Sequence, residues 1–110
     1  MKLTTFRAGE NDEVHIDVYV SAGEVRVEDV TIGSGPGKFL GDSVDRDYER
    51  IIRVKAEDLG GLLAALGHRG PASDEKVAEL IARQFAGITR SSLFEDFLKE
   101  HDVRFDIFAW

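Results

Sequence analysis

The sequence of 110 residues contains no cysteine, two prolines and one tryptophan. Without cysteine the chain can form no disulfide bond and no thiolate-ligated metal site, as expected of a protein in a reducing compartment. No apolar run approaches the roughly 20 residues that cross a bilayer, so we expect no membrane-spanning helix and no membrane partner. The opening residues, MKLTTFRAGENDE, lack the apolar stretch of a signal peptide. These absences predict a cytoplasmic protein.

Basic residues are also scarce in this chain. Lys and Arg total 14 against 21 Asp and Glu, which gives a formal net charge of −7. A field of this sign repels nucleic acid and attracts a basic partner. Hydrophobic residues make up 43% of the chain, and its length is typical of one domain. We therefore expect a single globular domain, residues 1–110, that does not bind nucleic acid.

The period of the apolar residues changes from two to 3.6 at about residue 56, which predicts strands before this point and helices after it. The strand period slips by one residue near Asp29, which predicts a β-bulge or a strand end there. Ser73 has the position of a helix N-cap, and Ser92-x-x-Glu95 has the form of a capping box. The predicted strands are residues 2–7, 14–20, 25–32, 48–55 and 103–110, and the predicted helices are residues 56–66, 73–86 and 92–101.

This order, ββββαααβ, predicts a two-layer α+β domain with a mainly antiparallel sheet and the helices packed on one face. The last strand returns after the helices, and it can lie parallel to a neighbour or at an edge. The predicted core consists of Val14, Ile16, Val18, Val25, Val27, Ile52, Val54, Leu59, Leu62, Leu63, Leu66, Val77, Leu80, Ile81, Phe85, Phe94, Phe97, Leu98, Phe105 and Ile107.

The glycine-rich segment TIGSGPGKFLGDS (residues 31–43) invites comparison with a phosphate-binding loop, G-x-x-x-x-G-K-[S/T]. Gly33 and Gly37 are one residue too close for that pattern, and Phe39 stands where the hydroxyl is required. Pro36 also removes an N–H donor that the loop would need. We therefore expect residues 33–39 to bind no nucleotide.

Other catalytic and metal-binding patterns are missing as well. The three histidines have no spacing typical of a zinc site, and no G-x-S-x-G elbow is present. Asp45 and Asp47 begin a spacing that resembles a calcium loop, but Glu49 replaces the third ligand and Arg50 replaces the obligatory glycine. The sequence thus predicts no catalytic residue, no metal and no cofactor.

Two features instead favour a binding surface. Four carboxylates fall between residues 42 and 49, and carboxylates grouped in this way suit a basic partner. The chain ends in FDIFAW, an aromatic tail typical of a segment packed on the body or on a partner. The candidate partner-binding residues are Asp42, Asp45, Asp47, Tyr48, Glu49, Phe108 and Trp110, with Glu10, Asp12 and Glu13 as a second acidic patch.

The segments DYERIIRVKAEDLGGLLAALG (residues 47–67) and LFEDFLKEHDVRFDIFAW (residues 93–110) together resemble a group of small acidic bacterial proteins. Relatives of this kind are similar to immunity proteins encoded beside polymorphic or contact-dependent toxins. The resemblance covers about half of the chain and carries no catalytic residue. It implies a protein partner, the cognate toxin.

Three functions therefore fit the sequence. The first is a non-enzymatic immunity protein that neutralises a basic toxin, such as a nuclease, through an acidic surface. The second is an enzyme whose site combines Asp45, Asp47, Glu49 and a histidine. The third is a homo-oligomeric module joined through edge strands. We favour the first, as a monomer or a weak homodimer.

Overall fold

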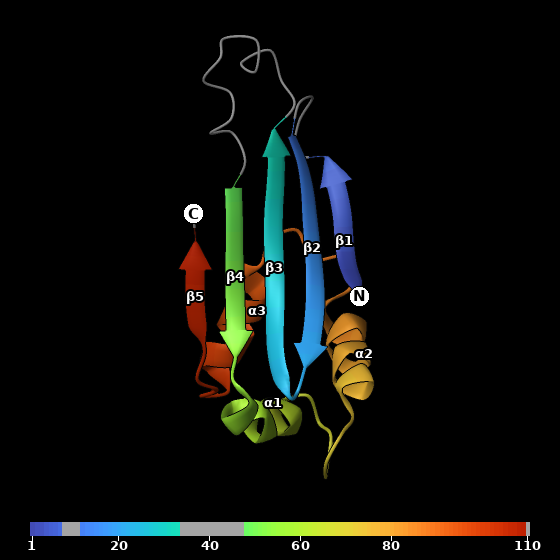
Figure 1. The fold of residues 1–110 in the computed structure, drawn as a ribbon, viewed down its shortest axis with the longest axis vertical. Coiled ribbons are helices and arrows are strands. Elements are labelled where there is room, and N and C mark those ends of the chain that lie inside the picture. Colours follow the sequence, from blue (N-terminus) through green and yellow to red (C-terminus); the bar gives the residue numbers. More distant parts are fainter. Residues whose placement is uncertain (8–11, 34–47, 110) are drawn as a thin grey trace.

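The computed structural model describes the backbone of residues 1–7, 12–33 and 48–109, and the side chains of residues 1, 13–32 and 49–109. Its strands form one sheet in the order β1-β2-β3-β4-β5, and each neighbouring pair is antiparallel (Figure 1). The α+β prediction is confirmed. The elements are β1(Lys2–Arg7), β2(Asp12–Ser21), β3(Glu24–Gly33), β4(Tyr48–Val54), the 3₁₀ turn η3(Ala56–Asp58), α1(Leu59–Ala65), α2(Asp74–Phe85), α3(Ser92–Glu100) and β5(Asp106–Ala109).

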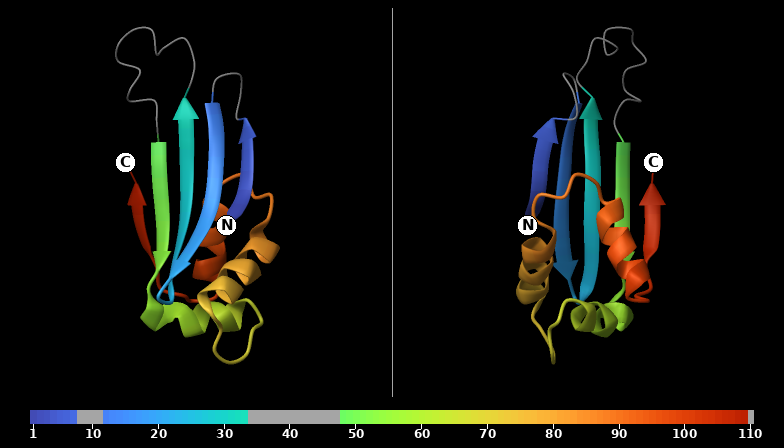
Figure 2. Two further views of the ribbon diagram at one scale, coloured as in Figure 1. Left: turned by 45° about the vertical axis from the view of Figure 1, so that its right-hand side comes forward. Right: turned by 180° about the vertical axis from the view of Figure 1, so that it is seen from behind.

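The helices cover one face of the sheet. Figure 2, seen from behind, shows α2 and α3 in front of the strands and α1 across their lower end. Apolar residues from alternate positions of the strands meet the apolar sides of these helices, and together they exclude water. The buried cluster consists of Val14, Ile16, Val18, Val25, Val27, Ile52, Val54, Leu62, Leu63, Val77, Ile81, Phe85, Phe94, Leu98 and Val103.

Most of the predicted core is confirmed, with differences at its margin. Five of the predicted core residues, Leu59, Leu66, Leu80, Phe97 and Phe105, are only partly buried and pack against the cluster. The prediction for Ile107 was wrong, because this side chain is 40% exposed on the edge strand β5. A residue at the margin of a sheet has a neighbouring strand on one side only, so strand parity alone overstates its burial.

The β2–β3 hairpin is tied to helix α2. Ala22 and Gly23 both have positive φ, 52° and 78°, as the two central residues of a type I′ turn require. The Asp74 carboxylate accepts hydrogen bonds from the backbone N–H groups of Ala22 at 2.9 Å and Gly23 at 3.0 Å. Ser73 caps the same helix, since its Oγ accepts from the N–H of Lys76 at 3.2 Å. The predicted N-cap is thus confirmed.

Strand β3 runs without interruption through Asp29. Its pairing with β2 and β4 keeps a constant register from Glu24 to Gly33, so the predicted bulge near Asp29 was wrong. The apolar period breaks at Asp29 because this carboxylate occupies a position on the covered face, where it is 8% exposed. Val30 and Ile32 lie on the opposite face.

Strand β5 is shorter than predicted and lies at the edge. It begins at Asp106, and it pairs antiparallel with β4 through Ile107↔Ile52 and Phe108↔Ile51. Val103, which was predicted to open the strand, instead lies in the core before the strand begins. Within the described part of the chain, no helix has the length and apolarity needed to cross a bilayer.

Candidate interaction surface

The face of β2–β5 that points away from the helices is called the open face here. Its residues alternate with the core residues along each strand, and the register aligns them in rows across the sheet. Figure 1 looks onto this face. Its described residues are Glu13, His15, Asp17, Tyr19, Ser21, Glu24, Arg26, Glu28, Val30, Ile32, Glu49, Ile51, Arg53, Asp106 and Phe108.

Carboxylates dominate the charge of the open face. The acidic side chains outnumber the basic ones, and both arginines are paired: Arg26 lies 3.6 Å from Glu28, and Arg53 lies 2.8 Å from Asp106. Among the residues of this face named above, six carboxylates stand against two arginines, and this excess gives that part of the face a negative field. The further acidic residues of the face are Glu13, Asp17, Glu24 and Glu49.

Arg53 organises the β4–β5 side of this face. Its guanidinium donates a hydrogen bond to Asp106 and lies 4.9 Å from the centroid of the Phe108 ring, a cation–π distance. Asp106 raises the pKa of Arg53 through this hydrogen bond. Arg53, joined by the charge of Lys55, holds the pKa of Asp106 below its ordinary value. Ile51 is only 4% exposed, although it lies on the open face.

Two aromatic rings project from the open face. Tyr19 is 49% exposed and Phe108 is 40% exposed. Beside them lie two hollows of about 320 and 380 Å³, which share Glu24 and Arg26 in their walls. Ile51 and Phe108 contribute to the first hollow, whereas Tyr19 contributes to the second. The face therefore offers exposed aromatic rings and hollows between charged side chains.

The structure brings two of the predicted binding residues together. Glu49 and Phe108 share the open face, since Phe108 pairs with Ile51 and Glu49 lies two residues before it on β4. Glu13, from the second acidic patch, lies on the same face. The backbone of Tyr48 pairs with Thr31, and that of Asp12 with Gly33. The predicted residues that lie outside the described part are Glu10, Asp42, Asp45, Asp47 and Trp110, together with residues 34–39 of the glycine-rich segment.

Sequence reasoning missed Tyr19 and Glu28 as candidate binding residues. The alternation that placed Val18 and Val27 in the core also assigned their neighbours to the other face. Because a solvated polar face is the ordinary outcome for an antiparallel sheet, alternation alone gave no reason to single them out. The signal appears only when the register brings acidic residues of four strands onto one surface.

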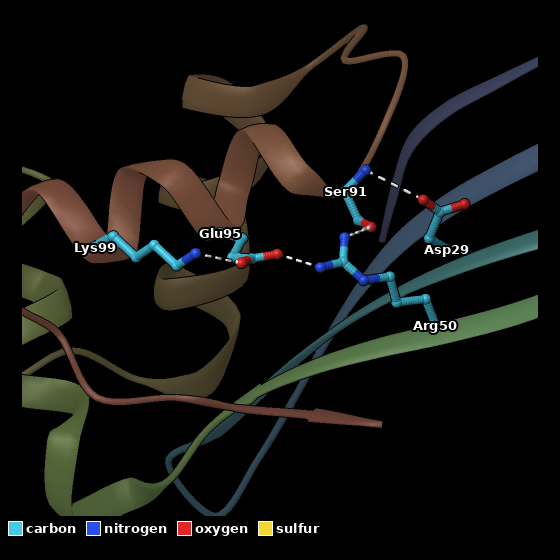
Figure 3. Close-up of polar contacts among 5 residues, drawn as sticks. All are labelled: Asp29, Arg50, Ser91, Glu95 and Lys99. Carbon is cyan, nitrogen blue, oxygen red and sulfur yellow. Dashed lines mark hydrogen bonds and ion pairs between the residues drawn. The ribbon is translucent and has the colours of Figure 1, made fainter. Parts of the chain in front are cut away.

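The covered face carries a polar cluster at the start of α3 (Figure 3). The Asp29 carboxylate accepts a hydrogen bond from the backbone N–H of Ser91 at 3.1 Å, close to the positive end of the helix. Arg50, the β4 partner of Asp29, donates to the Oγ of Ser91 at 3.2 Å and pairs with Glu95. Lys99 lies 2.8 Å from the other oxygen of Glu95.

This cluster corrects the predicted capping box. Ser91, and not Ser92, is the N-cap of α3, and its side chain makes no capping hydrogen bond. Glu95 turns to Lys99 and Arg50 because charge-assisted hydrogen bonds are stronger than a bond to a backbone N–H. The hydrogen bond from Lys99 has the largest effect on Glu95, and Arg50 acts in the same direction. Together they hold the pKa of Glu95 below its ordinary value. The two carboxylates and two cations balance in charge, and together they fix α3 on the sheet.

Of the enzyme site predicted from Asp45, Asp47, Glu49 and a histidine, the structure describes the side chains of Glu49 and the three histidines. His15 and Glu49 share a row of the open face, but Val30 stands between them. The His15 ring instead lies 2.8 Å from Glu13. In the described ranges no three residues of the types His, Cys, Asp and Glu lie together so that they could hold a metal ion.

Comparison with known proteins gives no family assignment. No protein-family model, no curated protein and no solved structure matches this chain.

Proposed function

We propose that this chain is a binding protein of the immunity type, which neutralises a basic protein partner through the open face of its sheet. One observation carries the proposal: the open face combines an excess of carboxylates with two exposed aromatic rings, Tyr19 and Phe108. Such a face complements a cationic surface that has apolar patches between its charges.

The rigidity of the sheet supports this function. Residues that share a face of a strand are about 7 Å apart, and neighbouring strands are about 4.8 Å apart. The carboxylates are thus held in a fixed array, so a partner that docks on them orders few backbone groups. In a basic cleft that binds nucleic acid, the carboxylates would occupy the positions of phosphates.

The aromatic rings supply the second part of the interaction. Exposed charges at the rim of an interface contribute little affinity, whereas buried aromatic and arginine side chains contribute most of it. Phe108 stacked on Arg53 is a preorganised pair of this kind, since the Asp106 ion pair already holds the guanidinium. We therefore expect the carboxylates to set the association rate, and Tyr19 and Phe108 to set the dissociation rate.

The test requires the partner protein. It is the basic protein that the immobilised chain retains from an extract of its native host, and it is then purified alone. Association is measured at low and high salt for the parent protein and for the double variant Glu28→Lys/Glu49→Lys. We expect fast association that slows with salt, and at least a tenfold slower rate for the variant at low salt, on the order of electrostatic steering effects.

Glu100→Lys/Glu57→Lys is the matched control, because it changes the net charge equally at two exposed sites outside the open face. Its rate should remain within about twofold of the parent rate. Neutralisation is then tested in cells that produce the partner, which should grow only with a chain whose open face is intact. Equal effects of both double variants, or a partner without basic character, would contradict the proposal.

A further inference from the structure

Among the described residues, no strand pairs with the outer edge of β5. Its single neighbour in the sheet is β4, and both views of Figure 2 place it at the margin. Ile107 and Phe108 are each 40% exposed, and Ala109 is exposed as well. Since consecutive residues of a strand point to opposite faces, this edge presents apolar side chains on both faces of the sheet.

The opposite edge, β1, differs from β5 in the features that discourage pairing. The register between β1 and β2 shifts between Lys2 and Thr4, and the strand begins and ends with basic residues, Lys2 and Arg7. Bulges and lysines are common protections of edge strands. The β4–β5 register has no shift, and β5 has neither lysine nor proline. Its single charge, Asp106, is already paired with Arg53.

We propose that β5 pairs antiparallel with β5 of a second copy of this chain, so that the two sheets become continuous. A two-fold axis perpendicular to the sheet places residues of one face opposite residues of the same face. With the axis at Phe108, the two Phe108 rings meet and Ile107 faces Ala109. With the axis at Ile107, the two Ile107 side chains meet and Phe108 faces Asp106.

The strand is self-complementary in both registers. In the first register apolar side chains meet apolar ones, and in the second the two Ile107 side chains meet while Phe108 faces Asp106. In neither register does a carboxylate of β5 face a carboxylate, a pairing that would destabilise the contact. This property favours a second copy over a foreign strand. Because β5 has only four residues, the contact is smaller than the roughly 800 Å² per partner of a stable interface. The dimer is therefore weak.

Salt distinguishes self-pairing from binding of a basic partner. Each copy carries a net charge of −7, so the two copies repel each other at long range. Salt screens this repulsion and strengthens the dimer, whereas it weakens attraction to a basic protein. The self-pairing thus stands or falls separately from the proposed function.

The experiment is sedimentation equilibrium of the full chain from micromolar to millimolar concentration, at low and high salt. We expect a monomer–dimer equilibrium that shifts toward dimer as salt rises. Ile107→Lys should lower the association constant by at least about tenfold, because pairing would bury an ammonium group. Ile32→Lys is the matched control, since Ile32 is 41% exposed but lies on the interior strand β3, and its association should be unchanged.

The absence of cysteine allows a direct readout of the register. Under mild oxidation, the variant whose cysteine lies at the two-fold axis, Phe108→Cys or Ile107→Cys, should form a disulfide-linked dimer. Ile32→Cys should not. A chain that stays monomeric at millimolar concentration in high salt overturns the proposal. A dimer that is insensitive to Ile107→Lys also overturns it. If the chain is monomeric and Ile107→Lys abolishes binding of the basic partner, the edge receives a partner strand and self-pairing is wrong.

Discussion

The two faces of the sheet come from alternate residues of the same strands, yet their charges are arranged differently. On the covered face, each charge of the cluster around Asp29 and Arg50 has an opposite charge or a backbone group beside it. On the open face, carboxylates exceed cations, and Tyr19 and Phe108 remain exposed. We therefore expect single substitutions on the covered face to lower stability and, if the proposed function holds, substitutions on the open face to weaken binding.

The largest expected effect is on the covered face, at Phe94. This ring is fully buried and meets Phe85 edge-on with a centroid distance of 5.1 Å. Phe94→Ala should lower the free energy of unfolding by about 3–5 kcal/mol, because it leaves a cavity in the core. Urea unfolding measures this loss. Phe97→Ala should cost less, since Phe97 is only partly buried, and an equal or larger cost would contradict this ranking.

A smaller loss is expected at Asp29, also on the covered face. Asp29→Ala leaves the buried N–H of Ser91 without its acceptor, which should lower the free energy of unfolding by about 1–3 kcal/mol. Asp29→Asn keeps an oxygen acceptor of the same size and should recover part of the loss. Thermal and urea unfolding of both variants test this. Equal losses of the free energy of unfolding in the two variants would show that the charge of Asp29, and not its hydrogen bond with Ser91, stabilises the fold.

The hairpin turn gives a gain of stability that should leave the open face unaffected. Ala22 has a φ of 52°, a region that costs an L-residue about 1 kcal/mol relative to glycine. Ala22→Gly should therefore raise the free energy of unfolding by about 0.5–1 kcal/mol. Gly23→Ala is the opposite control, because its φ is 78° and the new Cβ would lie 3.3 Å from the Cβ of Ala56. A stabilised Gly23→Ala variant would contradict this account of the turn.

The smallest expected effects appear in acid, and they involve both faces. The pKa of Glu95 in the folded protein lies below its ordinary value of 4.5, and that of Asp106 lies below 3.8. Each carboxylate therefore stabilises the fold above its ordinary pKa and loses this contribution as the pH falls through the lowered value. Glu95→Gln and Asp106→Asn should each show a shallower loss of stability between pH 5 and pH 2, measured by acid titration of urea midpoints. An unchanged slope would mean that the ion pair does not stabilise the fold.

Much of the fold could be predicted from local patterns. The period of two through Val14, Ile16 and Val18 and the period of 3.6 through Val77 and Ile81 specified which side of each element would be buried. The N-cap at Ser73 followed from its position before an amphipathic stretch. These features depend on residues close together in the sequence, which is why they could be predicted.

The errors arose where a distant partner decided the outcome. Asp29 is buried because Ser91, 62 residues away, provides an N–H for its carboxylate, so its strand needed no bulge. Glu95 left the predicted capping box because Arg50 and Lys99 offered charged partners. Ile107 is exposed because β5 lies at the edge of the sheet.

The candidate surface could be predicted only in part. Glu49 and Phe108 were chosen from the acidic cluster and the aromatic tail, and the register of β4 and β5 brings them onto one face. Tyr19 and Glu28 joined them only once the pairing of β2 and β3 was known. Their assignment to partner binding remains a prediction.

The central claim, that the open face contacts the basic partner, is tested most directly by photo-crosslinking from both sides of the molecule. A benzophenone side chain is introduced at Tyr19 on the open face and, in a second variant, at Gln84, an exposed residue of α2. The account predicts a crosslink to the partner from position 19 that disappears at high salt, and none from position 84. A crosslink from position 84 without one from position 19 would contradict it.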